Sequence, residues 1–191
     1  VLVTGLGNRF ATPDALGPYV VEHIQVNRHL ETDPAVMFSA VIPGVMAQTG
    51  IESGEILGGI INTVKPDVLL VVDALATSSV RRLCHTIQIT DTGIHPGSGV
   101  GNHRNGLTEE NLQVKVIGIG VPTVVDAATI VHDSMAHLLD TLEETEQKEF
   151  LDEMIAPNLY SMFVTPKDVD ETIKYLSFTI SEGLNIAFSQ V

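Results

Sequence analysis

Three parts of this 191-residue sequence hold side chains that could do chemistry, and each follows an expected strand or lies in a loop after one. Asp14 comes shortly after the strand-like residues 1–5, and Asp73 directly follows the apolar run 68–72. His95 lies in the glycine-rich loop 92–102. Ligands of open α/β sheets bind beyond the carboxyl ends of the strands. We therefore expect these three side chains to lie near one edge of a sheet.

Two carboxylates brought together could divide the roles of acid and base, because like charges at short range favour a shared proton. Such a pair, Asp14 and Asp73, could activate water for attack on a peptide carbonyl. With His95 added, the same group could instead hold a divalent metal. Each residue also has a structural interpretation. Asp14 could cap a helix, Asp73 could accept a hydrogen bond at the end of its strand, and His95 could be a structural residue of its loop. The sequence leaves these alternatives open.

Other polar residues are weaker candidates for catalysis. Ser98 lies in Pro-Gly-Ser-Gly, which does not match the G-x-S-x-G nucleophile motif. We interpret Cys84 as a buried structural thiol, because it and His85 should point to opposite faces of a strand. Asp91 begins an Asp-Thr-Gly triplet typical of pepsin-type proteases, but those are nearly all β. Asp126, at an expected helix start, is an acid stabilised by the helix dipole that could also line a pocket.

Several common templates are absent from the sequence. Gly5-Leu6-Gly7 lacks the third glycine of the dinucleotide-binding fingerprint, and the sequence contains neither a P-loop nor an H-E-x-x-H zinc motif. A single cysteine excludes an intrachain disulfide and a cysteine-only zinc site. These observations argue against nucleotide-dependent and zinc-helix chemistry.

The elements that must position the candidate residues alternate between strand and helix. Apolar or alternating segments predict strands at residues 1–5, 68–72, 85–90 and 114–121. Helical spacing of apolar residues, twice preceded by Thr-Pro, predicts helices at residues 12–24, 52–64, 124–142 and 166–188. Strands that are apolar throughout are typical of a parallel sheet covered on both faces. The sequence therefore predicts an α/β fold, a three-layer α/β/α sandwich with a mostly parallel sheet.

Composition limits the classes of partner. The chain has 24 Asp and Glu against 10 Lys and Arg, a net charge of −14, and 44% of it is hydrophobic, as in globular proteins. An acidic chain is a poor binder of nucleic acids or anionic membranes, which attract basic proteins. We expect one domain over residues 1–191, with an acidic connecting segment at residues 140–157. With no signal peptide or membrane span in the sequence, we expect a cytoplasmic protein.

The ordered motifs together resemble the germination protease family, the endopeptidases of spore-forming bacteria. The resemblance is dense from about residue 3 to residue 132 and resumes at residues 164–167. It rests on residues 5–8 (GLGN), 12–18 (TPDALGP), 43–46 (PGVM), 49–52 (TGIE), 72–76 (VDALA), 86–89 (TIQI), 91–102 (DTGIHPGSGVGN) and 120–127 (GVPTVVDA).

The resemblance implies a fold similar to that of the hydrogenase maturation endopeptidases, which is phosphorylase/hydrolase-like. It implies an endopeptidase of atypical aspartic type that initiates degradation of small acid-soluble spore proteins during germination. Asp14 and Asp73 match the proposed catalytic pair of the family. The residues expected to shape the site are His95, Gly97, Ser98, Gly99 and Asp126.

The resemblance also bears on cofactors and assembly. In the hydrogenase maturation family the positions that look like Asp14, Asp73 and His95 bind metal, so a metal-dependent peptidase is one alternative. A non-catalytic peptide-binding module is another, and otherwise we expect no cofactor. The family further implies a zymogen activated by removal of an N-terminal propeptide, a homotetramer, and a location in the spore core.

The chain departs from the family pattern in three places. Residues 28–40 form a shorter stretch than usual, Thr77-Ser78-Ser79 stands where arginine is expected, and residues 102–105 are less basic than usual. These departures bear on substrate preference more than on activity.

Overall fold

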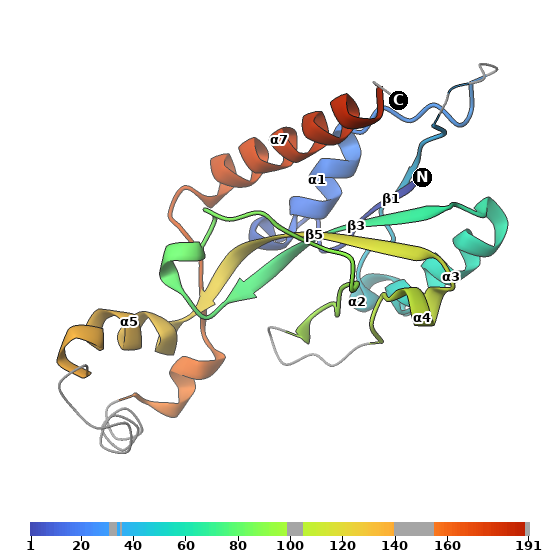
Figure 1. The fold of residues 1–191 in the computed structure, drawn as a ribbon. Helices are drawn as coiled ribbons and strands as arrows, with labels where there is room; N and C mark the ends of the chain where they lie inside the picture. Colours follow the sequence, from blue (N-terminus) through green and yellow to red (C-terminus); the bar gives the residue numbers. More distant parts are fainter. Residues whose placement is uncertain (31–33, 35, 99–104, 140–154, 190–191) are drawn as a thin grey trace.

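A computed structural model describes residues 1–30, 34, 36–98, 105–139 and 155–189. The described residues form a six-stranded sheet in the order β2-β1-β3-β5-β4, with β6 also paired to β5 (Figure 1). β1, β2, β3 and β5 run parallel, whereas β4 and β6 are antiparallel to β5. The strands are β1 (Leu2–Gly5), β2 (Ser39–Val41), β3 (Val68–Thr77), β4 (Gln88–Thr90), β5 (Lys115–Asp126) and β6 (Phe163–Val164). The mostly parallel sheet is confirmed.

Helices cover both faces of the sheet. α1 and α7 lie together on one face and α3 lies on the other, with α4 beside it, while α5 extends beyond the ends of β3 and β5 (Figure 1). The described helices are η1 (Thr12–Asp14), α1 (Leu16–His23), α2 (Met46–Thr49), α3 (Ser53–Val64), η2 (Val80–Arg82), α4 (Glu109–Leu112), α5 (Ala127–Leu139), η4 (Pro157–Ser161) and α7 (Val169–Ser189). The predicted three-layer α/β/α sandwich is confirmed.

Two cores result from the two-residue alternation of the strands. On the α1–α7 face, Val3 and Val72 pack with Leu16 of α1 and Ile173 of α7. On the α3 face, the core joins Leu2, Leu69 and Val71 of the strands to Leu57 and Ile61 of α3. Because residues 69, 71 and 73 share a face of β3, Asp73 belongs to the α3 side of the sheet.

β3 and β5 both continue beyond their predicted ends. Asp73 is therefore inside β3 rather than at its tip, and β5 continues through residues 122–126, of which residues 124–126 were predicted to be helical. Pro122 is tolerated there because the register shifts beside it: Leu75 pairs with Pro122 and Ala76 with Val124. Proline inside a sheet is found mainly at such bulges, where its missing N–H is not needed.

Other boundaries differ more modestly. The helix predicted at residues 12–24 is divided into η1 and α1, and the strand predicted at 85–90 is formed only at Gln88–Thr90. Thr165 does not begin α7 directly: its hydroxyl donates to the Thr123 carbonyl, and the helix starts at Val169. Most of the acidic segment, residues 140–154, lies outside the described residues. No helix in the described part of the chain is both long and apolar enough to span a membrane.

Cys84 is partly rather than fully buried, and its N–H donates to the Pro122 carbonyl at 2.7 Å. Burial, followed by the nearby charge of Asp168, raises the pKa of the Cys84 thiol. A raised pKa means less thiolate at neutral pH, and the thiolate is the reactive form. We therefore expect Cys84 to react with iodoacetamide more slowly than free cysteine at pH 7.5, and to approach the rate of free cysteine as the pH rises.

Mass spectrometry of the alkylated protein measures this rate without ambiguity, since the chain has one cysteine. The control is the same reaction in denaturant, where the ordinary pKa and rate should return. Alkylation of the folded protein as fast as free cysteine at pH 7.5 would contradict the expectation.

Candidate active site

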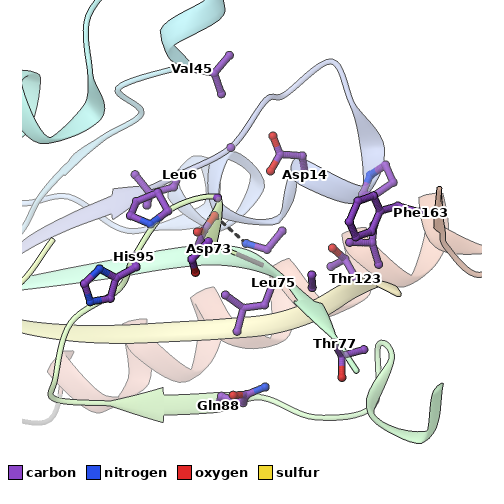
Figure 2. A pocket seen from close by; sticks show the side chains of 18 of the residues that line it. Leu6, Asp14, Val45, Asp73, Leu75, Thr77, Gln88, His95, Thr123 and Phe163 are labelled. Carbon is purple, nitrogen blue, oxygen red and sulfur yellow. Dashed lines mark hydrogen bonds between the residues drawn. The ribbon is translucent and has the colours of Figure 1, made fainter. Parts of the chain in front are cut away.

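A cleft of about 510 Å³ lies along β3, where β1 ends, and brings the predicted residues together. Asp14, Asp73, His95, Gly97 and Ser98 all line it. Figure 2 shows Asp14 on the segment that follows β1, with Asp73 on β3 and His95 on the loop after β4. Three segments that are distant in sequence thus meet at one cleft.

Asp73 is a buried carboxylate in the middle of the sheet, with 6% of its surface exposed. It pairs with Gly120 of β5, while the last β1 residue, Gly5, pairs with Val72. One carboxylate oxygen of Asp73, Oδ1, accepts the N–H of Ala74 at 3.0 Å. Asp73 is thus the first β3 residue beyond the end of β1, where the sheet opens into the cleft.

Asp14 is held by the turn that leaves β1. Its Oδ2 accepts the backbone N–H of Asn8 at 2.7 Å. Gly7 has φ 108°, and a Cβ there would lie 2.0 Å from the Asp14 carbonyl oxygen and 2.9 Å from its Oδ1. Only glycine fits this position, since it tolerates positive φ and adds no side chain. The carboxylate therefore closes the β1–η1 loop rather than capping a long helix.

A second close approach fixes the position of η1 and α1 against the sheet. A Cβ on Gly5 would lie 2.1 Å from the Gly17 carbonyl oxygen. A Cβ on Gly17 would lie 2.4 Å from the Leu6 carbonyl oxygen and 2.6 Å from the Val72 carbonyl oxygen. Because neither glycine has a side chain, the start of α1 contacts β1 backbone to backbone, which brings the preceding Asp14 to the edge of β3.

The loop that carries His95 is pinned at its base and turned at its tip. Ile94 and Leu107 exchange two backbone hydrogen bonds, 3.0 and 2.7 Å long. The Ser98 N–H donates to the His95 carbonyl at 3.2 Å across Pro96 and Gly97, and Gly97 has φ 74°. Proline followed by a glycine at positive φ is typical of a type II turn.

Glycines in β5 give this loop room to cross the sheet. A Cβ on Gly118 would lie 2.5 Å from the Ile94 side chain, and one on Gly120 would lie 2.4 Å from Leu75. The exposed ring of His95 lies over Gly106, where a Cβ would be 2.5 Å from its Cε1. Gly118 therefore makes room for Ile94 of the loop, and Gly120 makes room for the Leu75 side chain, which lines the cleft.

The residues that could hold a metal do not form a ligand group. Among the described residues, no three His, Cys, Asp or Glu side chains are placed so that they could hold one ion. That statement includes Asp14, Asp73 and His95, which share the cleft without converging as ligands.

Two predicted site residues have other outcomes. Asp126 does not line the cleft: its carboxylate accepts the N–H and the hydroxyl of Thr129, at 2.7 and 2.6 Å, at the start of α5. The site-shaping prediction for Asp126 is therefore not supported, and its interpretation as a helix-start acid is. Gly99 lies outside the described residues.

Sequence reasoning missed other residues of the cleft, which come from η2, β4, β5 and β6: Arg82, Gln88, Thr123 and Phe163. Gln88 and Thr123 lie within the family-like motifs at 86–89 and 120–127. The polar side chain inside each motif could have indicated that these two residues line the site. Arg82 and Phe163 had no such signal, because only the tertiary fold brings them to β3.

Comparison with solved structures concerns the fold. The chain has the fold of the [NiFe] hydrogenase maturation protease HycI from Thermococcus kodakarensis, with a TM-score of 0.50 over 100% of this chain and 92% of that one, at 18% identity. The family model for germination protease matches residues 1–142. This chain belongs to the germination protease family.

Curated relatives agree with this assignment. Germination protease of Caldanaerobacter subterraneus is 46% identical over 98% of this chain, and that of Clostridium tetani is 44% identical over 97%. That of Halalkalibacterium halodurans is 39% identical over 99%. The chain spans 65% of the length of the first two relatives and 66% of the third.

Proposed function

We propose that this chain is an endopeptidase that initiates the degradation of small acid-soluble spore proteins during germination. The observation that carries the proposal is the shared cleft of Asp14 and Asp73 in a chain of the germination protease family. The relatives are germination proteases, which supports a protease of germination, and the spore-protein substrate is inferred from the family resemblance.

In the proposed mechanism, Asp14 and Asp73 divide general base and general acid roles. One carboxylate takes a proton from water as it attacks the scissile carbonyl, and the protonated partner donates to the departing amine. The Asn8 N–H orients Asp14, and the Ala74 N–H orients Asp73. Backbone amides of the loop around Gly97 are candidates to stabilise the oxyanion.

Incubation of the purified chain with a small acid-soluble spore protein tests the proposal directly. We expect discrete internal cleavages, which mass spectrometry of the fragments locates. A non-catalytic peptide-binding module would bind the same protein, measurably by calorimetry, and leave it intact. Binding without cleavage would therefore replace the peptidase by that module.

We expect cleavage to continue after chelation. Asp14, Asp73 and His95 lack the arrangement of a metal-ligand group, as described above. The measurement is the cleavage rate before and after EDTA treatment and dialysis, with a metallopeptidase treated in parallel as the positive control. Loss of activity that a divalent metal restores would favour the metal-dependent alternative.

Three further properties belong to the same proposal. The family resemblance implies the atypical aspartic type. The family resemblance suggests a zymogen activated by removal of an N-terminal propeptide, and a homotetramer in the spore core. Size-exclusion chromatography with light scattering tests the tetramer, and N-terminal sequencing of the protein from spores tests the processing.

A further inference from the structure

Beside the candidate catalytic pair, one edge of β3 is covered by no strand of the described residues. On its β5 side, β3 is paired along its whole length, from Val68 to Thr77. On its β1 side the pairing stops at Val72, opposite Gly5. In the described part of the chain, no other strand continues along that side. The edge of β3 from residue 74 to residue 77 is therefore open, and it starts next to Asp73.

The cleft reaches this edge of β3, where Leu6, Gly7 and Asp14 line it, and also extends over the sheet to Gln88 of β4 and Thr123 of β5. Six consecutive residues, 73 to 78, line it. Successive side chains of a strand point to opposite faces, so a cleft over a single face would be lined by alternate residues. Lining by consecutive residues therefore indicates that the cleft reaches the backbone edge of β3 as well as one of its faces. In Figure 2, Asp73, Leu75 and Thr77 follow one another along β3 toward its carboxyl end.

We propose that the substrate binds as an added β-strand along this edge of β3. It would occupy the position beside β3 that β1 occupies up to Gly5. The inference rests on the proposed peptidase function and adds how the peptide is held. An extended backbone is the partner that a bare strand edge binds through main-chain hydrogen bonds. The edge leads to Asp73, so a peptide paired there brings one of its own peptide bonds to the two carboxylates.

The alternation of a pleated strand identifies the groups that the peptide meets. Leu6 N–H donates to the Val72 carbonyl at 2.8 Å, so the peptide groups of Val72 point to the β1 side. Those of Ala74 and Ala76, two and four residues on, point the same way. The Ala74 N–H bonds to the Asp73 carboxylate. The Ala74 carbonyl and both main-chain groups of Ala76 are therefore the ones offered to a substrate.

A scan with methylated peptides tests this arrangement on the unmodified chain. The cleaved segment of a small acid-soluble spore protein is located by mass spectrometry, and peptides of that segment are made with one backbone nitrogen methylated at a time. Each is measured as an inhibitor of cleavage of the intact spore protein. We expect inhibition to weaken on the order of tenfold when the methylated nitrogen faces β3, because one hydrogen bond to the edge is then lost. Methylation at the positions between should have little effect, because those nitrogens point away from β3.

A pair of variants at one position gives a second readout. Ala76→Pro removes the N–H that faces the substrate, whereas Ala76→Val keeps it and adds bulk. We expect Ala76→Pro to raise the KM for the spore protein several-fold more than Ala76→Val does, with circular dichroism showing both folded. Hydrogen exchange in the unmodified chain should show the Ala76 amide exchanging freely and becoming protected when the unmethylated peptide binds.

The outcomes separate this inference from the proposed function. Cleavage with no two-residue alternation in the methyl scan would overturn strand addition and leave the peptidase intact. An Ala76 amide already protected in the free protein would mean that another segment of the chain occupies the edge, which also overturns it. No cleavage of the spore protein at all would overturn the proposed function and this inference together.

Discussion

Replacement of Asp73 by asparagine is expected to reduce cleavage of a small acid-soluble spore protein by about 10²- to 10⁴-fold, the range that general acid–base groups contribute. Asparagine keeps the size of the side chain and can still accept the Ala74 N–H, but it can neither take nor give the proton. Asp14→Asn should have an effect of similar size, because the proposed mechanism needs both carboxylates. Fragment yield over time, measured by mass spectrometry, gives the rates.

Asp91→Asn is the matched control for this pair. Asp91 begins the Asp-Thr-Gly triplet, is exposed and does not line the cleft, so we expect its replacement to leave the rate unchanged. A loss of activity in Asp91→Asn would instead support a catalytic role for the Asp-Thr-Gly triplet. Full activity in both Asp14→Asn and Asp73→Asn would remove the acid-pair mechanism, provided that all variants show the same circular dichroism.

Gly17→Ala is expected to destabilise the fold by about 3 kcal/mol or more, the upper range for overpacking. The added Cβ would lie within 2.6 Å of backbone atoms of Leu6 and Val72, which have no rotamer to change. Either α1 moves away from β1 or the chain does not fold. In both cases Asp14, on the preceding turn, is displaced from the cleft. Denaturant unfolding followed by circular dichroism gives the change in free energy.

Gly59→Ala is the control with the opposite expected sign. Gly59 lies in α3, and a Cβ there meets nothing within 4 Å. Alanine is the better helix former, so this change should stabilise the protein by about 0.5 to 1 kcal/mol. Both glycines lie in helices, which separates close approach from helix propensity. Equal stability of the two variants would refute the backbone contact between α1 and β1.

Sequence reasoning was most successful where local pattern and tertiary need agree. The apolar run at residues 68–72 is buried in β3, and Asp73 follows it into the cleft. These agreements come from the spacing of apolar residues and from the order of residues along the chain, both of which a single sequence contains. His95 lies in the cleft too, but not for the expected reason: β4 is antiparallel, so its carboxyl end points to the other edge of the sheet, and the loop returns past Gly118 to reach the cleft.

The misses come from pairing that a single sequence does not contain. Asp73 was taken as the end of a strand, since a charged residue commonly stops an apolar run. β3 continues to Thr77 because β5 pairs with it there, and β5 passes Pro122 by a register shift. Residues 124–126 were assigned to a helix for the same reason. The open edge of β3 could not be predicted, because it follows from β3 and β5 both extending beyond the end of β1.

One consequence of the two-core architecture concerns the order in which the chain is made. The core on the α1–α7 face joins Val3 and Leu16 near the start of the sequence to Ile173 and Ile180 near its other end. A ribosome releases β1, β3 and both aspartates well before α7. Until α7 emerges, α1 alone covers that face of the sheet, and the core that α7 completes is unfinished. We expect the nascent chain to lack its stable fold until synthesis passes α7.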